Sequence, residues 1–159
     1  RRQRQMCIRD RFKNEYKNEF VELTKSWLNE YFWIEPSDEE LFANPIAAYI
    51  ETGGEILVAL DADSNVVAGV CALVFHSQEN IWEMSKLSVR PQYRHNGIAE
   101  RLVDAIIKTA KSKGAEKLFL DTSVKLEAAV RLYRRKGFIE IPLRNSHYQR
   151  TDIQMMIEL

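Results

Sequence analysis

The stretch Arg94-His95-Asn96-Gly97-Ile98-Ala99 joins a strand-like run, residues 82–89, to a long amphipathic helix. Backbone N–H groups in so short a connection can point outward in succession, and the N-terminus of the helix adds a partial positive charge. Gly97 lets a ligand approach the backbone closely. The stretch is therefore a candidate cradle for a pyrophosphate. The pattern Arg-x-x-Gly-x-Ala is weak by itself, so its weight comes from its neighbours.

The chain has 159 residues, of which 45% are hydrophobic. That is enough for one compact domain with a core, and too little for two. No apolar run approaches the roughly 18 residues that cross a bilayer, and the first residues lack the pattern of a secretory signal, so we expect a cytoplasmic protein without a membrane partner. Cys7 and Cys71 do not form a disulfide pattern, and the histidines are isolated, so we expect neither a disulfide nor a metal site.

Residues 1–11 read RRQRQMCIRDR, which is the translation of a common transposase sequencing adapter. We expect this segment to be an artefact, residues 12–159 to form the single domain, and the native first strand to be truncated or replaced by Ile8 and its neighbours. A basic arm for nucleic acid is the alternative. Without these residues the balance of 23 basic and 23 acidic side chains becomes 18 basic and 22 acidic. A mildly acidic domain with no basic, aromatic-rich face predicts no nucleic-acid partner.

Hydrophobic periodicity and turn residues divide the rest of the chain into helices and strands. Ser37 is the expected cap of the second helix because its oxygen can accept an unpaired backbone N–H. Antiparallel strands followed by a strand-helix-strand crossover indicate a mixed α/β sheet. The pattern predicts helices at about 14–31, 37–43, 45–53, 98–114 and 126–137, and strands at 55–61, 66–76, 81–89, 117–122, 138–141 and 153–159.

The strand at 81–89 carries an irregularity in its pattern. Its expected inward residues Met84, Leu87 and Val89 are spaced three and then two, whereas an unbroken strand keeps a period of two. The slip predicts a β-bulge near Ser85 to Leu87. A bulge splays the strand from its neighbour and frees backbone polar groups to meet a ligand.

Three blocks resemble the GNAT superfamily of N-acetyltransferases in their order and spacing. They are Met84-Ser85-Lys86-Leu87-Ser88-Val89-Arg90-Pro91, then Arg94-x-x-Gly-x-Ala, then residues 126–138 with Ala129-Val130-Arg131-Leu132-Tyr133 and Gly137-Phe138. The resemblance covers roughly residues 55–159. It implies an α/β fold of the α+β type, with a mixed, mostly antiparallel central sheet, helices on both faces and a splayed, bulged central strand.

The resemblance also implies acetyl-CoA as co-substrate. Its pyrophosphate would lie on the N–H groups of Arg94, His95, Asn96, Gly97, Ile98 and Ala99. Its pantetheine arm would follow the segment Leu87-Ser88-Val89 through the backbone groups of Leu87 and Val89. The Leu87 amide would polarise the thioester carbonyl as an oxyanion donor. Neither Lys86 nor the Ser88 side chain needs a special role.

Direct attack of an amine on a thioester requires a neutral amine, a stabilised oxyanion and a proton for the departing thiolate. Tyr133 is our candidate for the proton donor, although a tyrosine on an apolar helical face is often simply core. The base is open. Asp121, at the end of its strand, and Glu83, on the bulged strand, are the candidates, each of which can equally be a solvated residue. Deprotonation relayed by water is the third possibility.

The implied function is transfer of an acetyl group to a primary amine, on a small molecule or an amino-acid-like acceptor, by direct transfer in a ternary complex. Leu126 stands where many relatives have an asparagine near the cofactor. A catalytically inactive acyl-CoA-binding sensor or partner module is therefore the alternative. A homodimer is compatible with this fold, which often pairs through its sheet edge.

The acceptor side is the least defined part of the sequence. Arg144, His147, Tyr148 and Arg150 crowd the loop before the last strand. A pair of arginines could hold the carboxylate of an amino-acid-like acceptor. Ordinary solvated charges are the simpler interpretation, which we prefer.

Overall fold

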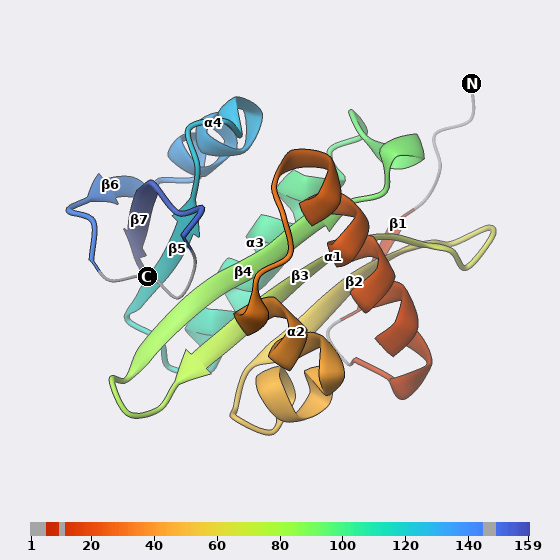
Figure 1. Ribbon diagram of the computed structural model, residues 1–159, viewed down its shortest axis with the longest axis horizontal. Coiled ribbons are helices and arrows are strands. Elements are labelled where there is room, and N and C mark those ends of the chain that lie inside the picture. The colour runs from red at the N-terminus through yellow and green to blue at the C-terminus, as the bar shows by residue number, and fades with distance from the viewer. Residues whose placement is uncertain (1–5, 10–11, 145–148) are drawn as a thin grey trace.

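The computed structural model describes residues 6–9, 12–144 and 149–159. A seven-stranded sheet with the order β1-β2-β3-β4-β5-β7-β6 runs through it (Figure 1). The elements are β1 Met6–Arg9, η1 Asn14–Tyr16, α1 Lys17–Tyr31, α2 Pro36–Ala43, η2 Ile46–Ile50, β2 Glu55–Asp61, β3 Val67–His76, β4 Ile81–Val89, η3 Pro91–Tyr93, α3 Ile98–Ser112, β5 Lys117–Thr122, α4 Glu127–Arg135, β6 Ile139–Ile141 and β7 Ile153–Glu158.

The predicted mixed sheet is confirmed. Neighbouring strands pair antiparallel except β4 and β5, which are parallel and pair where Glu83 lies opposite Phe119. Beyond that point the two strands diverge, β4 toward α3 and β5 toward α4 (Figure 1). The sheet is therefore open along one half of its central junction.

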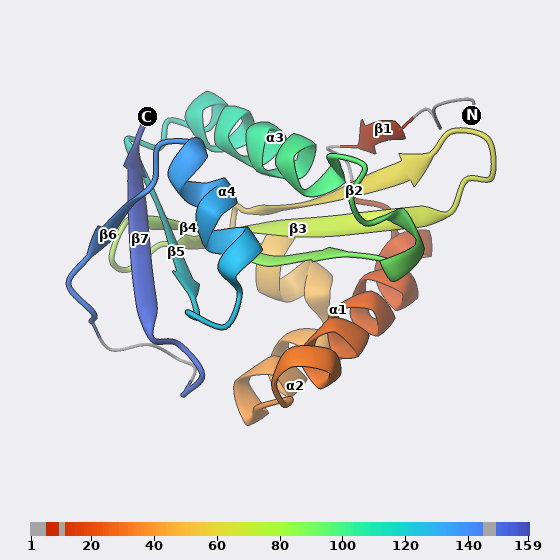
Figure 2. The ribbon, with the colours of Figure 1, turned by 90° about the horizontal axis from the view of Figure 1, so that it is seen from above.

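Helices cover both faces of the sheet, as expected: α1 and α2 lie on one face, and α3 and α4 on the other (Figure 2). Successive residues of β3 point to opposite faces of the sheet, so this one strand contributes side chains to two core layers. Cys71 and Leu73 pack with α3 and α4, whereas Val70 and Ala72 pack with α1. β3 is buried from Val67 to Leu73 because helices cover it on both sides.

The predicted bulge is confirmed in β4. Val70 lies opposite Ser88 but Ala72 lies opposite Ser85, so Lys86 and Leu87 together face the single residue Cys71. The extra residue is accommodated at Lys86, whose φ of 57° is unusual for a residue with a side chain. The bulge lies where β4 leaves β5.

The predicted cap of α2 is wrong. Glu35, not Ser37, is the N-cap residue, and its backbone N–H donates to Oδ2 of Asp38 at 2.9 Å. Pro36 accounts for the difference, because its fixed φ and missing N–H suit the first position of a helix. The helix therefore begins before Ser37.

The N-terminal edge of the sheet is formed by β1, where Ile8 pairs with Ala59 of β2. Ile8 thus occupies the place of a first strand, while residues 1–5 and 10–11 lie outside the described residues. None of the described helices is long and apolar enough to cross a bilayer. Cys7 and Cys71 are free thiols, and the described residues contain no cluster of three or more potential metal ligands.

Candidate active site

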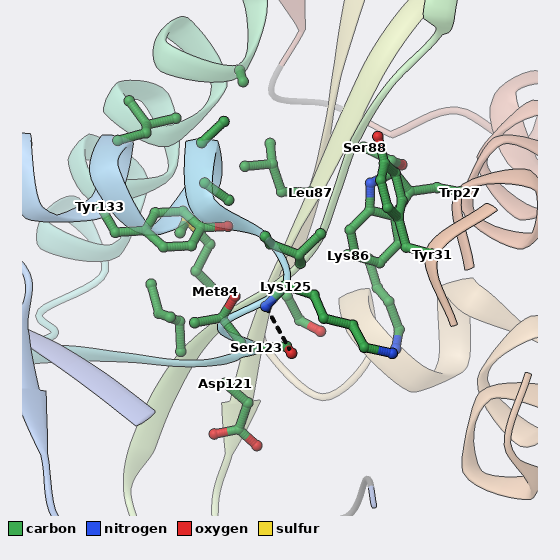
Figure 3. Close-up of a pocket in the computed structure, with 18 of the residues that line it drawn as sticks. Trp27, Tyr31, Met84, Lys86, Leu87, Ser88, Asp121, Ser123, Lys125 and Tyr133 are labelled. Atoms are coloured by element: carbon green, nitrogen blue, oxygen red, sulfur yellow. Dashed lines mark hydrogen bonds between the residues drawn. The ribbon is translucent and has the colours of Figure 1, made fainter. Parts of the chain in front are cut away.

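A cleft of about 530 Å³ lies where β4 and β5 diverge. Its walls are the C-terminal end of α1, the bulged half of β4, the end of β5 and the start of α4 (Figure 3). It brings together eight of the residues that the sequence singled out, namely Glu83, Leu87, Ser88, Val89, Arg94, Ala99, Asp121 and Tyr133. His95, Asn96, Gly97 and Ile98 do not line it, and instead form the turn that leads into α3.

The turn into α3 presents its backbone rather than its side chains. Gly97 is the N-cap, with a φ of 74°, and a Cβ placed there would meet nothing within 4 Å. The first helical bond runs from Arg101 N–H to the Gly97 carbonyl, so the N–H groups of Ile98, Ala99 and Glu100 have no partner within the helix. An approach to these groups is open.

The side chains of the same turn have structural contacts. Asn96 donates from Nδ2 to the carbonyls of Tyr93 and Arg94, at 3.1 and 3.0 Å. Ile98 is buried in the core, and His95 is exposed. The side chains of Asn96 and Ile98 thus hold the turn, whereas the His95 side chain faces solvent beside it.

Arg94 lies at the rim of the cleft and is already paired. Its guanidinium donates two hydrogen bonds to Glu30 on α1, at 3.0 and 2.7 Å, and lies 5.8 Å from the ring of Tyr31. The hydrogen bond to Glu30 raises the pKa of Arg94. Glu30 and Arg94 are 64 positions apart, so the sequence carried no local signal for this pair.

Tyr133 belongs to the core and also lines the cleft, so its position fits both of the interpretations that the sequence left open. Its ring packs in the core against Phe138, with 5.9 Å between ring centroids. Its hydroxyl points into the cleft toward Leu87 (Figure 3). Burial, with a smaller contribution from Cys71, raises the pKa of the phenol. The hydroxyl is therefore protonated at neutral pH and can act as a proton donor.

The two candidate bases differ in their partners. Oε1 of Glu83 lies 2.9 Å from Nε2 of His76, at the end of the neighbouring strand β3. Asp121 accepts a hydrogen bond from Nε2 of Gln154 at 3.0 Å. Sequence reasoning missed His76, although the register of the β3–β4 hairpin could have placed it near Glu83.

Two buried hydroxyls in the cleft lack hydrogen-bond partners within the described part of the chain. They are Oγ of Ser88 on β4 and Oγ1 of Thr122 on β5, one on each diverging strand. An unpaired buried hydroxyl costs roughly 1–3 kcal/mol. A polar ligand between the strands would remove that cost, so the Ser88 side chain is a better site candidate than its sequence suggested, and Thr122 is a new one.

A buried ion network borders the cleft on its α2 side. Nζ of Lys86 donates to Asp38 at 2.8 Å, and Arg150 donates to Asp38 at 2.8 and 3.0 Å and to Glu35 at 2.8 Å. Burial opposes ionisation of Asp38, but the hydrogen bonds from Arg150 and the charge of Lys86 outweigh it and lower its pKa. The network joins the bulge, α2 and the segment before β7.

The network corrects two interpretations from the sequence. Arg150 is not a solvated charge, because its side chain is only 10% exposed, and Lys86 does have a structural role. Arg144 is exposed, whereas Arg150 is held in the network, and His147 and Tyr148 lie outside the described residues. The guanidinium of Arg150 is already occupied by protein carboxylates.

The acetyltransferase (GNAT) family model matches residues 10–138. The chain is 35% identical over 82 residues to the N-alpha-acetyltransferase 30 of Schizosaccharomyces pombe, which covers 51% of this chain and 55% of that relative. The match therefore spans little more than half the length of that relative. It is 33% identical over 124 residues to an uncharacterised N-acetyltransferase of the same yeast, covering 76% of this chain and 75% of the relative.

A shorter match connects the chain to the [ribosomal protein bS18]-alanine N-acetyltransferase of Escherichia coli, with 30% identity over 66 residues, 42% of this chain and 45% of that one. Among solved structures, a GNAT acetyltransferase of Staphylococcus aureus superposes with a TM-score of 0.83 at 24% identity, covering 97% and 99% of the two chains. A phosphinothricin acetyltransferase of Sinorhizobium meliloti in complex with acetyl-CoA gives 0.78 at 18% identity, covering 97% and 88%.

Proposed function

This chain belongs to the GNAT family of acetyltransferases, and we propose that it transfers the acetyl group of acetyl-CoA to a primary amine within a ternary complex. The observation that carries the proposal is the cleft itself. One opening between β4 and β5 holds the bulge at Lys86 and Leu87, the hydroxyl of Tyr133 and two carboxylates.

The cleft has features that suit acetyl-CoA. The unpaired N–H groups at the start of α3 and the open space at Gly97 would receive the pyrophosphate. The unpartnered hydroxyls of Ser88 and Thr122 would meet the polar pantetheine arm. The co-substrate supplies an activated acetyl thioester, and the chain supplies the groups that hold it.

Each of these residues would serve a different part of the reaction. The Leu87 backbone N–H would stabilise negative charge on the thioester carbonyl oxygen, a contribution of about 3–4 kcal/mol for a donor of this kind. As the amine nitrogen bonds to the acetyl carbon and the carbon–sulfur bond breaks, Tyr133 would donate its proton to the thiolate, and it would regain one from water before the next cycle. The amine proton would go to a base, and no bond to the enzyme forms.

Glu83 is our choice for that base, with Asp121 as the alternative. Glu83 lies on the bulged strand and lines the cleft, and its contact with His76 gives its proton an onward acceptor. Asp121 is bound to the amide of Gln154, which cannot accept a proton in this way. The acetyl-transfer rates of the variants Glu83→Gln and Asp121→Asn check the choice. Only removal of the true base should lower the rate by roughly 10²-fold or more.

As the acceptor, we propose the α-amine of a polypeptide in preference to a small amino-acid-like amine. The carboxylates of Asp38 and Glu35 occupy Arg150, so it is not offered to the carboxylate of a free amino acid. The first residue of a polypeptide carries an amide there instead. The ribosomal protein named as acceptor of the Escherichia coli relative favours the same choice.

The test is release of free CoA thiol from acetyl-CoA with a panel of peptides that differ in their first residue and of small primary amines. Thiol release that depends on the amine, with an acetylated product in the mass spectrum, is the expected result. A preference for peptides supports the polypeptide acceptor, and a preference for small amines overturns it. Tight acetyl-CoA binding without turnover on any amine would instead favour a sensor module.

A further inference from the structure

His76 and Glu83 connect two cavities. Glu83 lines both the main cleft and a second cavity of about 220 Å³, whereas His76 lines only the second one. Their contact of 2.9 Å joins the end of β3 to β4 next to the β3–β4 turn. Both side chains are mostly buried, with 28% and 18% of their surfaces exposed. The pair therefore spans the wall between the reaction cleft and an outer cavity.

The reaction needs such a connection. Each turnover releases one proton from the amine. A base that the bound substrates shield from solvent has to pass this proton on before the next cycle. A carboxylate at the cleft that contacts an imidazole facing another cavity has the right order of groups. Imidazole is also the side chain that gains and loses a proton near neutral pH.

We propose that Glu83 and His76 form a proton relay that carries the acceptor's proton from the cleft to the second cavity. The inference rests on the proposed acetyl transfer. The Glu83 carboxylate takes the proton as the nitrogen–carbon bond forms and passes it to Nε2 of neutral His76. The imidazolium then loses its other ring proton to water, and exchange of the remaining proton between the two ring nitrogens through water frees Nε2 for the next cycle. His76 touches Glu83 and not the substrates, so it is a positioning residue.

The charges around His76 set the pH at which the relay operates. Besides Glu83, the charged groups that line the second cavity are Glu79 in the β3–β4 turn, Asp121 on β5 and Arg144 after β6. The hydrogen bond to Glu83 raises the pKa of His76, burial opposes this, and the charges of Glu83, Glu79 and Asp121 raise it further. Below this raised pKa His76 is protonated and cannot accept, so activity rises as pH passes through it.

His76→Gln tests the relay, because its amide can still hydrogen-bond Glu83 but cannot take a proton. We expect kcat/KM for the amine at neutral pH to fall at least about tenfold, and the acidic limb of the pH profile that belongs to His76 to disappear. The acetyl-CoA dissociation constant and the melting temperature should be unchanged. Glu79→Gln is the control, because it removes a charge that raises the pKa of His76 without breaking the relay. It should move the limb to lower pH and leave the plateau as in the wild type.

The double variant with Glu83→Gln separates the relay from a structural role. In a relay, His76→Gln adds no further loss to Glu83→Gln, because the path is already broken. A His76→Gln protein with the wild-type plateau and acidic limb would overturn the relay, while an active wild type would leave the proposed function standing. A wild type without turnover on any amine would overturn the proposed function itself.

Discussion

At the scale of single residues, the position of Tyr133 fits both its burial and the proton transfer proposed for it. The ring contributes to the core of the α3 face while the hydroxyl reaches the cleft. Burial raises the pKa of the phenol, so the group carries its proton at neutral pH. In the proposed reaction it shares that proton with the sulfur as the carbon–sulfur bond breaks.

Tyr133→Phe should therefore lower kcat by roughly 10²-fold, because it removes the proton donor and keeps the ring. The dissociation constant of acetyl-CoA should stay the same, as measured by calorimetry. Tyr16→Phe is the matched control, because Tyr16 is about equally buried but packs in the α1 layer. An equal loss of kcat in both variants would show that the effect of Tyr133 is only structural.

Asp38 is the residue on which the ion network depends. Asp38→Asn should lower the free energy of unfolding by about 3–5 kcal/mol, because it leaves two buried cations with one less carboxylate. The surface pair Asp104–Lys136, at 2.9 Å, gives the control Asp104→Asn, for which we expect about 1 kcal/mol or less. Urea denaturation measures both. Similar losses in the two variants would contradict the structural role of the network.

The sequence allowed prediction of the residues that stand in local patterns, but not of their distant partners. The bulge was predicted from the spacing in its strand, and Tyr133, a candidate from the sequence, lies at the cleft. The partners of Arg150 were not predicted, since Asp38 is 112 positions away and a charged residue before a strand is usually solvated. Ion pairs over such distances depend on the tertiary fold, which no local period reports.

At the scale of elements, the two ends of α3 are alike in geometry, and the proposed pyrophosphate site distinguishes them. Gly97 and Gly114 flank the same helix, both have positive φ, and a Cβ at either would meet nothing within 4 Å. The two glycines are thus alike in backbone strain. Only Gly97 borders the proposed pyrophosphate position.

Gly97→Ala and Gly114→Ala should each cost about 1 kcal/mol of stability from the left-handed backbone. Only Gly97→Ala should weaken the binding of acetyl-CoA, by roughly tenfold, because its methyl group fills the space in front of the N–H groups. Binding of acetyl-pantetheine, which has no pyrophosphate, should not change. Equal weakening of both donors would place the pyrophosphate elsewhere.

Strands and helices were predictable because burial imposes a period on them. The bounds of β2, β4 and β5 agree with the sequence pattern. The cap of α2 was not predicted, because Glu35 is a less common cap than Ser37. Pro36 at the first helical position and the local contact of Glu35 with Asp38, three residues away, fix the start of the helix.

At the scale of the whole molecule, the site follows from the divergence of two parallel strands. The bulge turns β4 away from β5, helices on both faces close the sides, and the turn into α3 lies at one end (Figures 1 and 2). The resemblance to a family anticipated this arrangement. The second cavity was not predicted, because β5 as well as the β3–β4 hairpin lines it, although the hairpin register could have placed His76 near Glu83.

The most direct test of the account is a crystal structure of the protein with acetyl-CoA. We predict the pyrophosphate on the backbone of Arg94 to Ala99, the pantetheine arm between β4 and β5, and the thioester sulfur beside the Tyr133 hydroxyl. The carbonyl oxygen should accept the N–H of Leu87. Acetyl-CoA bound outside this cleft, or in it with the thioester remote from Leu87 and Tyr133, would contradict the account.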